Sequence, residues 1–106
     1  MELTGTWTAV CPLEELTGPK RFLVGGRAIV VWRTDSGRLS ALDDRCPHQS
    51  TALSSGTVVD EELICVGHGW SVGIDGWCDL AGAGTRSHPV EERDGVVHVL
   101  AAVHSG

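Results

Sequence analysis

The sequence contains few aromatic residues, no long apolar run and no excess of positive charge. None of its 106 residues is tyrosine, and its longest apolar run, Ala28 to Trp32, is far shorter than the roughly twenty residues that span a bilayer. Eight basic and fourteen acidic side chains give a formal net charge of −6, which argues against nucleic acid and anionic membranes as partners. We therefore expect a cytoplasmic monomer that docks on a basic protein surface.

A sustained helical period is also missing from the sequence. Apolar residues alternate or form short runs between Gly and Asp, which predicts a single all-β domain over residues 1–106. Two-residue turns at Gly25-Gly26, Asp75-Gly76 and Asp94-Gly95 are expected to join neighbouring strands as hairpins. The expected strands cover residues 6–10, 21–24, 27–33, 39–43, 57–59, 62–65, 70–74, 77–80, 88–93 and 96–101.

Two short motifs each place one cysteine and one histidine on a tight loop between strands. They are Cys46-Pro47-His48 and Cys65-Val66-Gly67-His68. Two sulfur and two nitrogen ligands can surround one zinc ion, or hold one iron through the cysteines and a second iron through the histidines. Zinc fingers usually pair like residues in each clip, whereas a mixed clip lets each loop reach both metals. The spacing favours a two-iron cluster, and a zinc-braced interaction domain stays as an alternative.

These motifs resemble the two cluster loops of Rieske-type [2Fe-2S] ferredoxins, and the likeness covers the chain from about Trp7 to about Val99. The flanking segments Asp44-Arg45-Cys46-Pro47-His48-Gln49 and His68-Gly69-Trp70 are similar to that family, as are Leu53-Ser54 and the following Gly56. The resemblance implies three stacked antiparallel sheets. It also implies one cluster at the tip of a small cluster-binding subdomain, from about residue 43 to about residue 83.

The same resemblance implies a role for each motif residue. Cys46 and Cys65 hold the iron that stays ferric, and His48 and His68 hold the iron that accepts the electron. The outer ring nitrogens of both histidines then lie at the surface and form the electron's exit. The residues expected around these four ligands are Pro47, Gly67, Gly69 and Trp70.

Some features of high-potential Rieske proteins are missing. Those proteins carry a serine two residues and a tyrosine four residues after the second histidine ligand, where this chain has Trp70 and Val72. Their disulfide between the loops is replaced here by Thr51 and Gly67. We expect a reduction potential near the negative end of the Rieske range, which is about −150 to +300 mV. The chain thus resembles the soluble, low-potential ferredoxins that serve oxygenases.

The remaining cysteines and histidines are not expected to have a role in the chemistry. Cys11 and Cys78 are interpreted as buried small apolar residues rather than a disulfide. His88, His98 and His104 are interpreted as surface or strand residues without a function. No serine nucleophile, phosphate-binding glycine loop or mononuclear iron site can be assembled from the other residues. The sequence therefore predicts that the chain is not itself an enzyme.

The expected function is transfer of single electrons through one [2Fe-2S] cluster. The donor is an NAD(P)H-dependent flavoprotein reductase, and the acceptor is a terminal oxygenase, either a ring-hydroxylating dioxygenase or a multicomponent monooxygenase. Both partners are expected to dock transiently near His48 and His68. The alternative is a small Rieske subunit held permanently in an enzyme that resembles a nitrite reductase.

Overall fold

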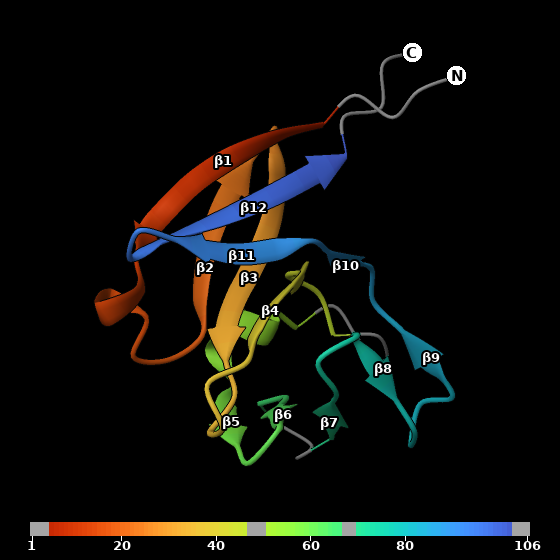
Figure 1. Cartoon of the computed structure of the whole chain (residues 1–106). Helices are drawn as coiled ribbons and strands as arrows, with labels where there is room; N and C mark the ends of the chain where they lie inside the picture. The colour runs from red at the N-terminus through yellow and green to blue at the C-terminus, as the bar shows by residue number, and fades with distance from the viewer. Residues whose placement is uncertain (1–4, 47–50, 67–69, 103–106) are drawn as a thin grey trace.

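The structure is a computed structural model that describes residues 5–46, 51–66 and 70–102. These ranges contain antiparallel strands and two single-turn 3-10 helices, without any α-helix (Figure 1). The expected all-β class is therefore confirmed. The first 3-10 helix, η1, covers Leu13–Glu15.

One sheet joins the two ends of the described chain, in the strand order β1-β12-β11. The strands are β1 (Gly5–Pro12), β12 (Val96–Ala102) and β11 (Val90–Arg93). Asp94 and Gly95 join β11 to β12, with φ angles of 52° and 81°. Two successive positive φ angles are typical of the hairpin turn that the Asp-Gly pair predicted.

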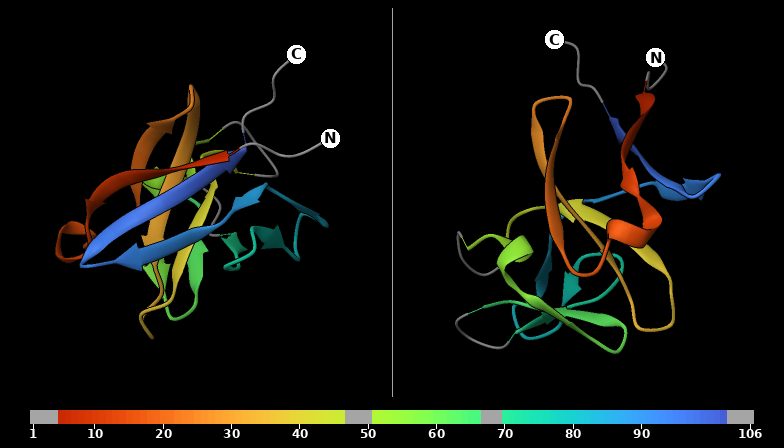
Figure 2. Two further views of the ribbon diagram at one scale, coloured as in Figure 1. Left: turned by 45° about the horizontal axis from the view of Figure 1, so that its top comes forward. Right: turned by 90° about the vertical axis from the view of Figure 1, so that its left-hand side faces the viewer.

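A second sheet crosses behind the first in Figure 1, in the order β10-β4-β3-β2. Its strands are β10 (Ser87–His88), β4 (Leu39–Asp43), β3 (Arg27–Arg33) and β2 (Lys20–Val24). The expected hairpin at Gly25-Gly26 is confirmed, because both glycines have positive φ and β2 pairs with β3. The two views of Figure 2 show how this sheet lies between the first sheet and the shorter strands.

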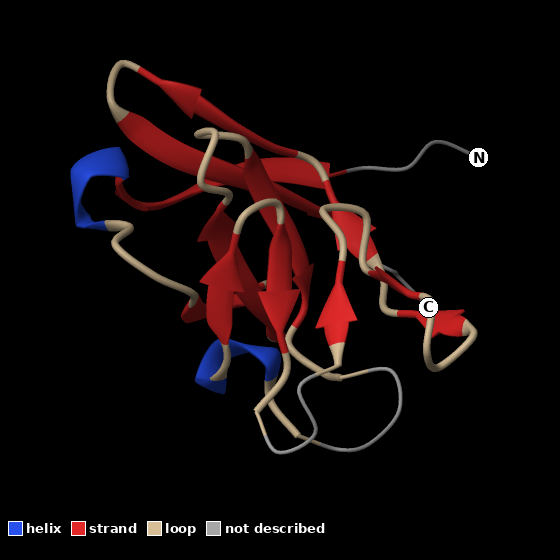
Figure 3. Ribbon diagram, turned by 90° about the horizontal axis from the view of Figure 1, so that it is seen from below, coloured by secondary structure: helices blue, strands red, loops and turns tan. Residues whose placement is uncertain are grey.

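Short strands make up the other end of the molecule. A third sheet has the order β5-β6-β7, and β8 pairs with β9 alone. Figure 3 looks onto this end and shows the second 3-10 helix beside these strands. The elements are η2 (Leu53–Ser55), β5 (Thr57–Val59), β6 (Glu62–Ile64), β7 (Ser71–Val72), β8 (Trp77–Cys78) and β9 (Ala83–Gly84).

The hairpin expected around Asp75-Gly76 is wrong, because β7 pairs with β6 and β8 pairs with β9. The reason lies in the close approach of Gly76 to the segment that follows β9. The Thr85 amide donates to the Gly76 carbonyl at 3.0 Å, and a Cβ at Gly76 would lie 2.4 Å from the Thr85 carbonyl oxygen. One backbone hydrogen bond crosses the turn, from the Gly73 amide to the Trp77 carbonyl at 3.0 Å, but the strand that follows pairs with β9 and not with β7.

The single strand expected over residues 88–93 is divided at Pro89. Proline has no amide hydrogen to donate to a neighbouring strand, so a continuous ladder is interrupted there. His88 ends β10, which pairs with β4, whereas β11 begins at Val90 and pairs with β12. The chain changes sheets at this position and so connects the first sheet to the second.

This arrangement produces two separate hydrophobic cores, and β3 contributes side chains to both of them. Its successive side chains point to opposite faces, so that Ile29 and Val31 enter one core and Val30 and Trp32 enter the other. The base core consists of Leu16, Val24, Ile29, Val31, Ala41, Val97 and Val99. The site core consists of Val30, Trp32, Leu42, Cys46, Leu53, Leu63, Cys65, Val72 and Cys78.

Candidate functional site

The structure brings the two cysteines of the motifs into the same buried core. Cys46 follows β4 by three residues, and Cys65 follows β6 directly. Their exposed fractions are 2% and 1%, and both belong to the site core. Two strands from different sheets thus deliver the two expected sulfur ligands to one interior region.

Each cysteine closes its own loop with a backbone hydrogen bond of the same pattern. The Cys46 amide donates to the Thr51 carbonyl at 2.9 Å, and the Cys65 amide donates to the Trp70 carbonyl at 2.6 Å. In both cases the acceptor lies five positions after the cysteine. The ends of the two motif loops are therefore fixed in equivalent ways, and each loop starts from a buried cysteine.

The histidines of the motifs, His48 and His68, lie outside the described residues, as do Pro47, Gly67 and Gly69. Their assignment as ligands or neighbours of ligands stays a prediction. Trp70 is described: it is half-buried and packs against the site core. This position is compatible with a shielding role beside the second loop.

The sequence reasoning gave no role to the two consecutive carboxylates before Cys46, Asp43 and Asp44. Asp44 has a side chain with 0% exposure, and it accepts hydrogen bonds from the amide and the hydroxyl of Ser54, each at 2.7 Å. Asp43 instead accepts from Arg27 Nη1 at 3.1 Å and contacts His88 Nε2 at 2.8 Å. The chain before the first loop is thus held by side-chain hydrogen bonds in two directions.

His88 lies in β10, as expected of a strand residue, but the sequence did not reveal that its side chain makes a specific contact. Its side chain is 3% exposed, and its ring is held against the Asp43 carboxylate. A polar residue on a strand that precedes Pro89 gave no sign of this contact, because Asp43 lies 45 positions earlier in the chain. The pairing of β10 with β4 brings the two side chains together.

Gly56 connects the exit of the first loop with the entrance of the second. A Cβ at this position would lie 2.1 Å from the carbonyl oxygen of Ile64, the residue directly before Cys65. Only glycine permits this backbone approach. The glycine after Leu53-Ser54 was noted in the sequence as a family feature, and its contact with β6 supplies the physical reason.

The two cysteines outside the motifs, Cys11 and Cys78, differ in burial. Neither forms a disulfide: Cys78 lies in the site core, and Cys11 packs at the edge of the base core. Burial raises the pKa of the Cys11 thiol, which keeps this cysteine in its neutral form. The expected burial is confirmed for Cys78, whereas Cys11 is only half-buried.

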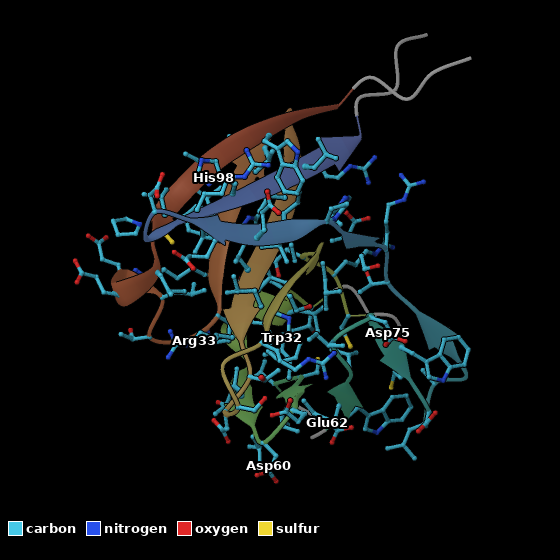
Figure 4. The ribbon with its side chains drawn as sticks, viewed as in Figure 1. Trp32, Arg33, Asp60, Glu62, Asp75 and His98 are labelled. Atoms are coloured by element: carbon cyan, nitrogen blue, oxygen red, sulfur yellow. The ribbon has the colours of Figure 1, made fainter. Side chains whose placement is uncertain are left out.

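The described residues fit the sulfur side of a two-iron cluster. Two buried cysteines from separate strands share one core, as two ligands of the same iron require. The same core contains the Trp32 indole, whose buried N–H has no hydrogen-bond partner among the described residues (Figure 4). A buried donor of this kind normally has an acceptor.

Comparison with known proteins gives a family. A model of the Rieske [2Fe-2S] domain matches residues 6–99. The phthalate 4,5-dioxygenase oxygenase subunit of Pseudomonas putida is 38% identical over 66% of this chain, and the 3-chlorobenzoate-3,4-dioxygenase oxygenase subunit of Comamonas testosteroni is 35% identical over 82%. The aligned segments make up 17% and 23% of those two proteins, so the chain matches only a small part of their length.

A solved structure shows the same likeness in three dimensions. The crystal structure of apo dicamba monooxygenase superimposes with a TM-score of 0.80 and 30% identity. The superposition covers 92% of this chain and 33% of the monooxygenase chain. The Rieske fold is therefore shown by sequence and by structure.

These relatives correct one expectation from the sequence. The prediction that the chain stands outside the enzymes, as a separate electron-transfer component, is wrong, because the matching proteins are oxygenase subunits and a monooxygenase. The prediction failed because the sequence reasoning considered only chemistry that these 106 residues could assemble alone.

Among the described residues, no helix is long and apolar enough to cross a membrane. The chain belongs to the family of Rieske [2Fe-2S] domains, whose cofactor is a [2Fe-2S] cluster.

Proposed function

We propose that this chain is the electron-carrying domain of a Rieske oxygenase system. It accepts one electron at a time from an NAD(P)H-dependent flavoprotein reductase and passes each electron to a terminal oxygenase centre of the dioxygenase or monooxygenase type. The oxygenase subunits among its relatives support this setting. The reduced flavin of the reductase supplies the electron, and the iron of the oxygenase centre accepts it.

The proposed ligands are Cys46 and Cys65 for one iron and His48 and His68 for the other. A cluster held in this way would take up and release one electron at the iron that the two histidines bind. Residues 1–106 form one domain in this proposal, with a cluster-binding subdomain from about residue 43 to about residue 83. The partners dock near the two histidines, and a cytoplasmic location and a monomeric state stay predictions.

The matched geometry of the two cysteine loops is the observation that carries the proposal. Both loops start at a buried cysteine, both are closed by an amide-to-carbonyl hydrogen bond from that cysteine, and both cysteines enter one core. A single zinc ion would use the same four side chains, so the metal must be identified directly. A red-brown protein with inorganic sulfide indicates the cluster, and a colourless protein indicates zinc.

The test compares three buried cysteines of the same core. The wild-type protein is purified without oxygen and analysed for iron, sulfide and visible absorption. We expect Cys46→Ala and Cys65→Ala to lose the cluster, because each removes one thiolate ligand. Cys78→Ala is the matched control: it removes a thiol from the same core and should retain iron and sulfide at wild-type content. Retention of the cluster by Cys46→Ala, or its loss from Cys78→Ala, would contradict the ligand assignment.

A further inference from the structure

The carboxylate of Asp44 is fully buried, with a side-chain exposure of 0%. It lies two residues before Cys46. We propose that Asp44 is a positioning residue that also sets the potential: its carboxylate fixes the spacing of the two cysteine loops and disfavours the reduced cluster. This inference rests on the proposed function, because it takes Cys46 as a ligand.

The first step is the hydrogen bonding around the Cys46 loop. Asp44 Oδ1 accepts from the Ser54 amide and Oδ2 accepts from the Ser54 hydroxyl, each at 2.7 Å. These two bonds join residues on either side of the loop, ten positions apart. The Cys46 amide adds a third bond inside them, to the Thr51 carbonyl. The entrance and the exit of the first loop are therefore held together by one buried side chain.

The second step connects this pair to the other loop. Ser54 lies in η2, and the η2 turn ends with the Gly56 amide bonded to the Leu53 carbonyl at 2.9 Å. Gly56 in turn lies against the carbonyl of Ile64, directly before Cys65. The backbone that Asp44 holds is thus in contact with the strand that delivers the second cysteine. A displacement of Ser54 would change the spacing between the two sulfur atoms.

The third step concerns charge. Asp44 forms an ion pair with Arg21, whose Nε lies 3.8 Å from Oδ2; the Arg21 side chain is 56% exposed, so solvent weakens its compensation of the Asp44 charge. Asp43 is 24% exposed and has closer partners in Arg27 and His88. A buried negative charge with little compensation opposes the addition of a further negative charge nearby. Asp44 is therefore placed to keep the potential low.

The experiment measures the midpoint potential of the cluster at a fixed pH in two variants, for which the inference predicts shifts in opposite directions. Asp44→Asn removes the charge and keeps an acceptor oxygen. We expect a shift of at least tenfold in the reduction equilibrium toward the reduced form, which is 59 mV for one electron. Ser54→Ala keeps the charge and removes a donor that disperses it, so its midpoint should become more negative. If the substitutions only loosened the loops, the midpoint potentials of both variants would shift in the same direction.

Asp43→Asn is the matched control, because it neutralises the adjacent carboxylate, and its shift should be less than a third of that in Asp44→Asn. A wild-type protein without a Rieske spectrum would remove the proposed function, and this inference with it. A normal wild-type spectrum with an unchanged or lowered midpoint in Asp44→Asn would overturn this inference alone. If Asp44→Asn does not retain the cluster, the sign of the shift in Ser54→Ala decides: a negative shift supports the inference, and an unchanged or positive midpoint overturns it.

Discussion

The two cores of this domain are built from different kinds of side chain. The base core contains only aliphatic residues, and β1, β3 and β12, which surround it, have seven or eight residues each. The site core contains three cysteines and an indole N–H without a hydrogen-bond partner among the described residues, and strands β5 to β9 have two or three residues each.

This difference indicates that the two ends of the domain depend on different interactions. Burial of apolar surface and long ladders stabilise the base. At the site end, a buried polar group without a partner costs about 1–3 kcal/mol, and short strands contribute few cross-strand pairs. We infer that the base folds without the cluster, whereas the site end needs the cluster to complete its structure.

Removal of the metal should produce the largest difference between the two ends of the domain. Chelation of the iron is expected to abolish amide-exchange protection in β5 to β9 and to leave the protected amides of β1, β3 and β12 close to their original rates. Hydrogen exchange followed by mass spectrometry of peptides from each region measures this directly. Uniform loss of protection over both ends would show that the cores are not independent.

Gly56→Ala should have the next largest effect. The backbone at this position, with φ of −87°, is open to any residue, so the obstacle is steric: a Cβ would lie 2.1 Å from the Ile64 carbonyl oxygen and 3.2 Å from the Leu53 carbonyl oxygen. We expect loss of most of the cluster content with the base still folded, measured by visible absorption and circular dichroism. Gly18→Ala is the control, because a Cβ there meets no atom within 4 Å. Full cluster content in Gly56→Ala would contradict the structural link between the loops.

Truncation of one residue in each core separates stability from cluster retention. Leu63 in the site core and Ile29 in the base core are both 0% exposed, and replacement of either by alanine should cost about 2–5 kcal/mol in the free energy of unfolding. Only Leu63→Ala is expected to shorten the half-life of the cluster absorbance. Equal half-lives in the two variants would remove the distinction between the cores.

The smallest effect should come from a surface contact between the two ends. Ser36, in the turn after β3, donates its hydroxyl to Glu61 in the turn between β5 and β6, at 2.8 Å. This hydrogen bond is the main cause that lowers the pKa of Glu61 below its ordinary value of 4.5. A lowered pKa in the folded state gives stability at pH values above 4.5, which is lost as the pH falls through the folded-state pKa.

Ser36→Ala should therefore reduce the melting temperature slightly at neutral pH and leave it unchanged at a pH well below 4.5. Thermal unfolding of both proteins as a function of pH measures this. A difference between the proteins that persists at acid pH would mean that Ser36 acts by another route.

Local turn chemistry was the part of the fold that the sequence predicted well. Gly25-Gly26 and Asp94-Gly95 form the expected hairpins because two positive φ angles need such residues. Asp75-Gly76 carries the same signal, yet the partner of β8 is decided by the approach of Gly76 to Thr85, which is a tertiary contact. A dipeptide specifies a turn but not the strand that pairs after it.

The site was predictable where its chemistry has a fixed spacing, and not where contacts join distant residues. Cys46 and Cys65 could be identified from their motifs, and the structure brings both into one core. Asp44 and Ser54 were named only as parts of the family resemblance, and neither their contact nor that of His88 with Asp43, forty-five positions away, follows from a period in the sequence. Buried hydrogen-bond partners of this kind appear only once the strands are paired.

A redox titration of the purified wild-type protein, followed by electron paramagnetic resonance, tests the central claim most directly. We expect a Rieske-type signal to appear on reduction, with a midpoint below that of the standard hydrogen electrode and one unpaired electron for each chain. The absence of a signal at any potential from metal-loaded protein would contradict the electron-carrying role and leave zinc binding to be tested.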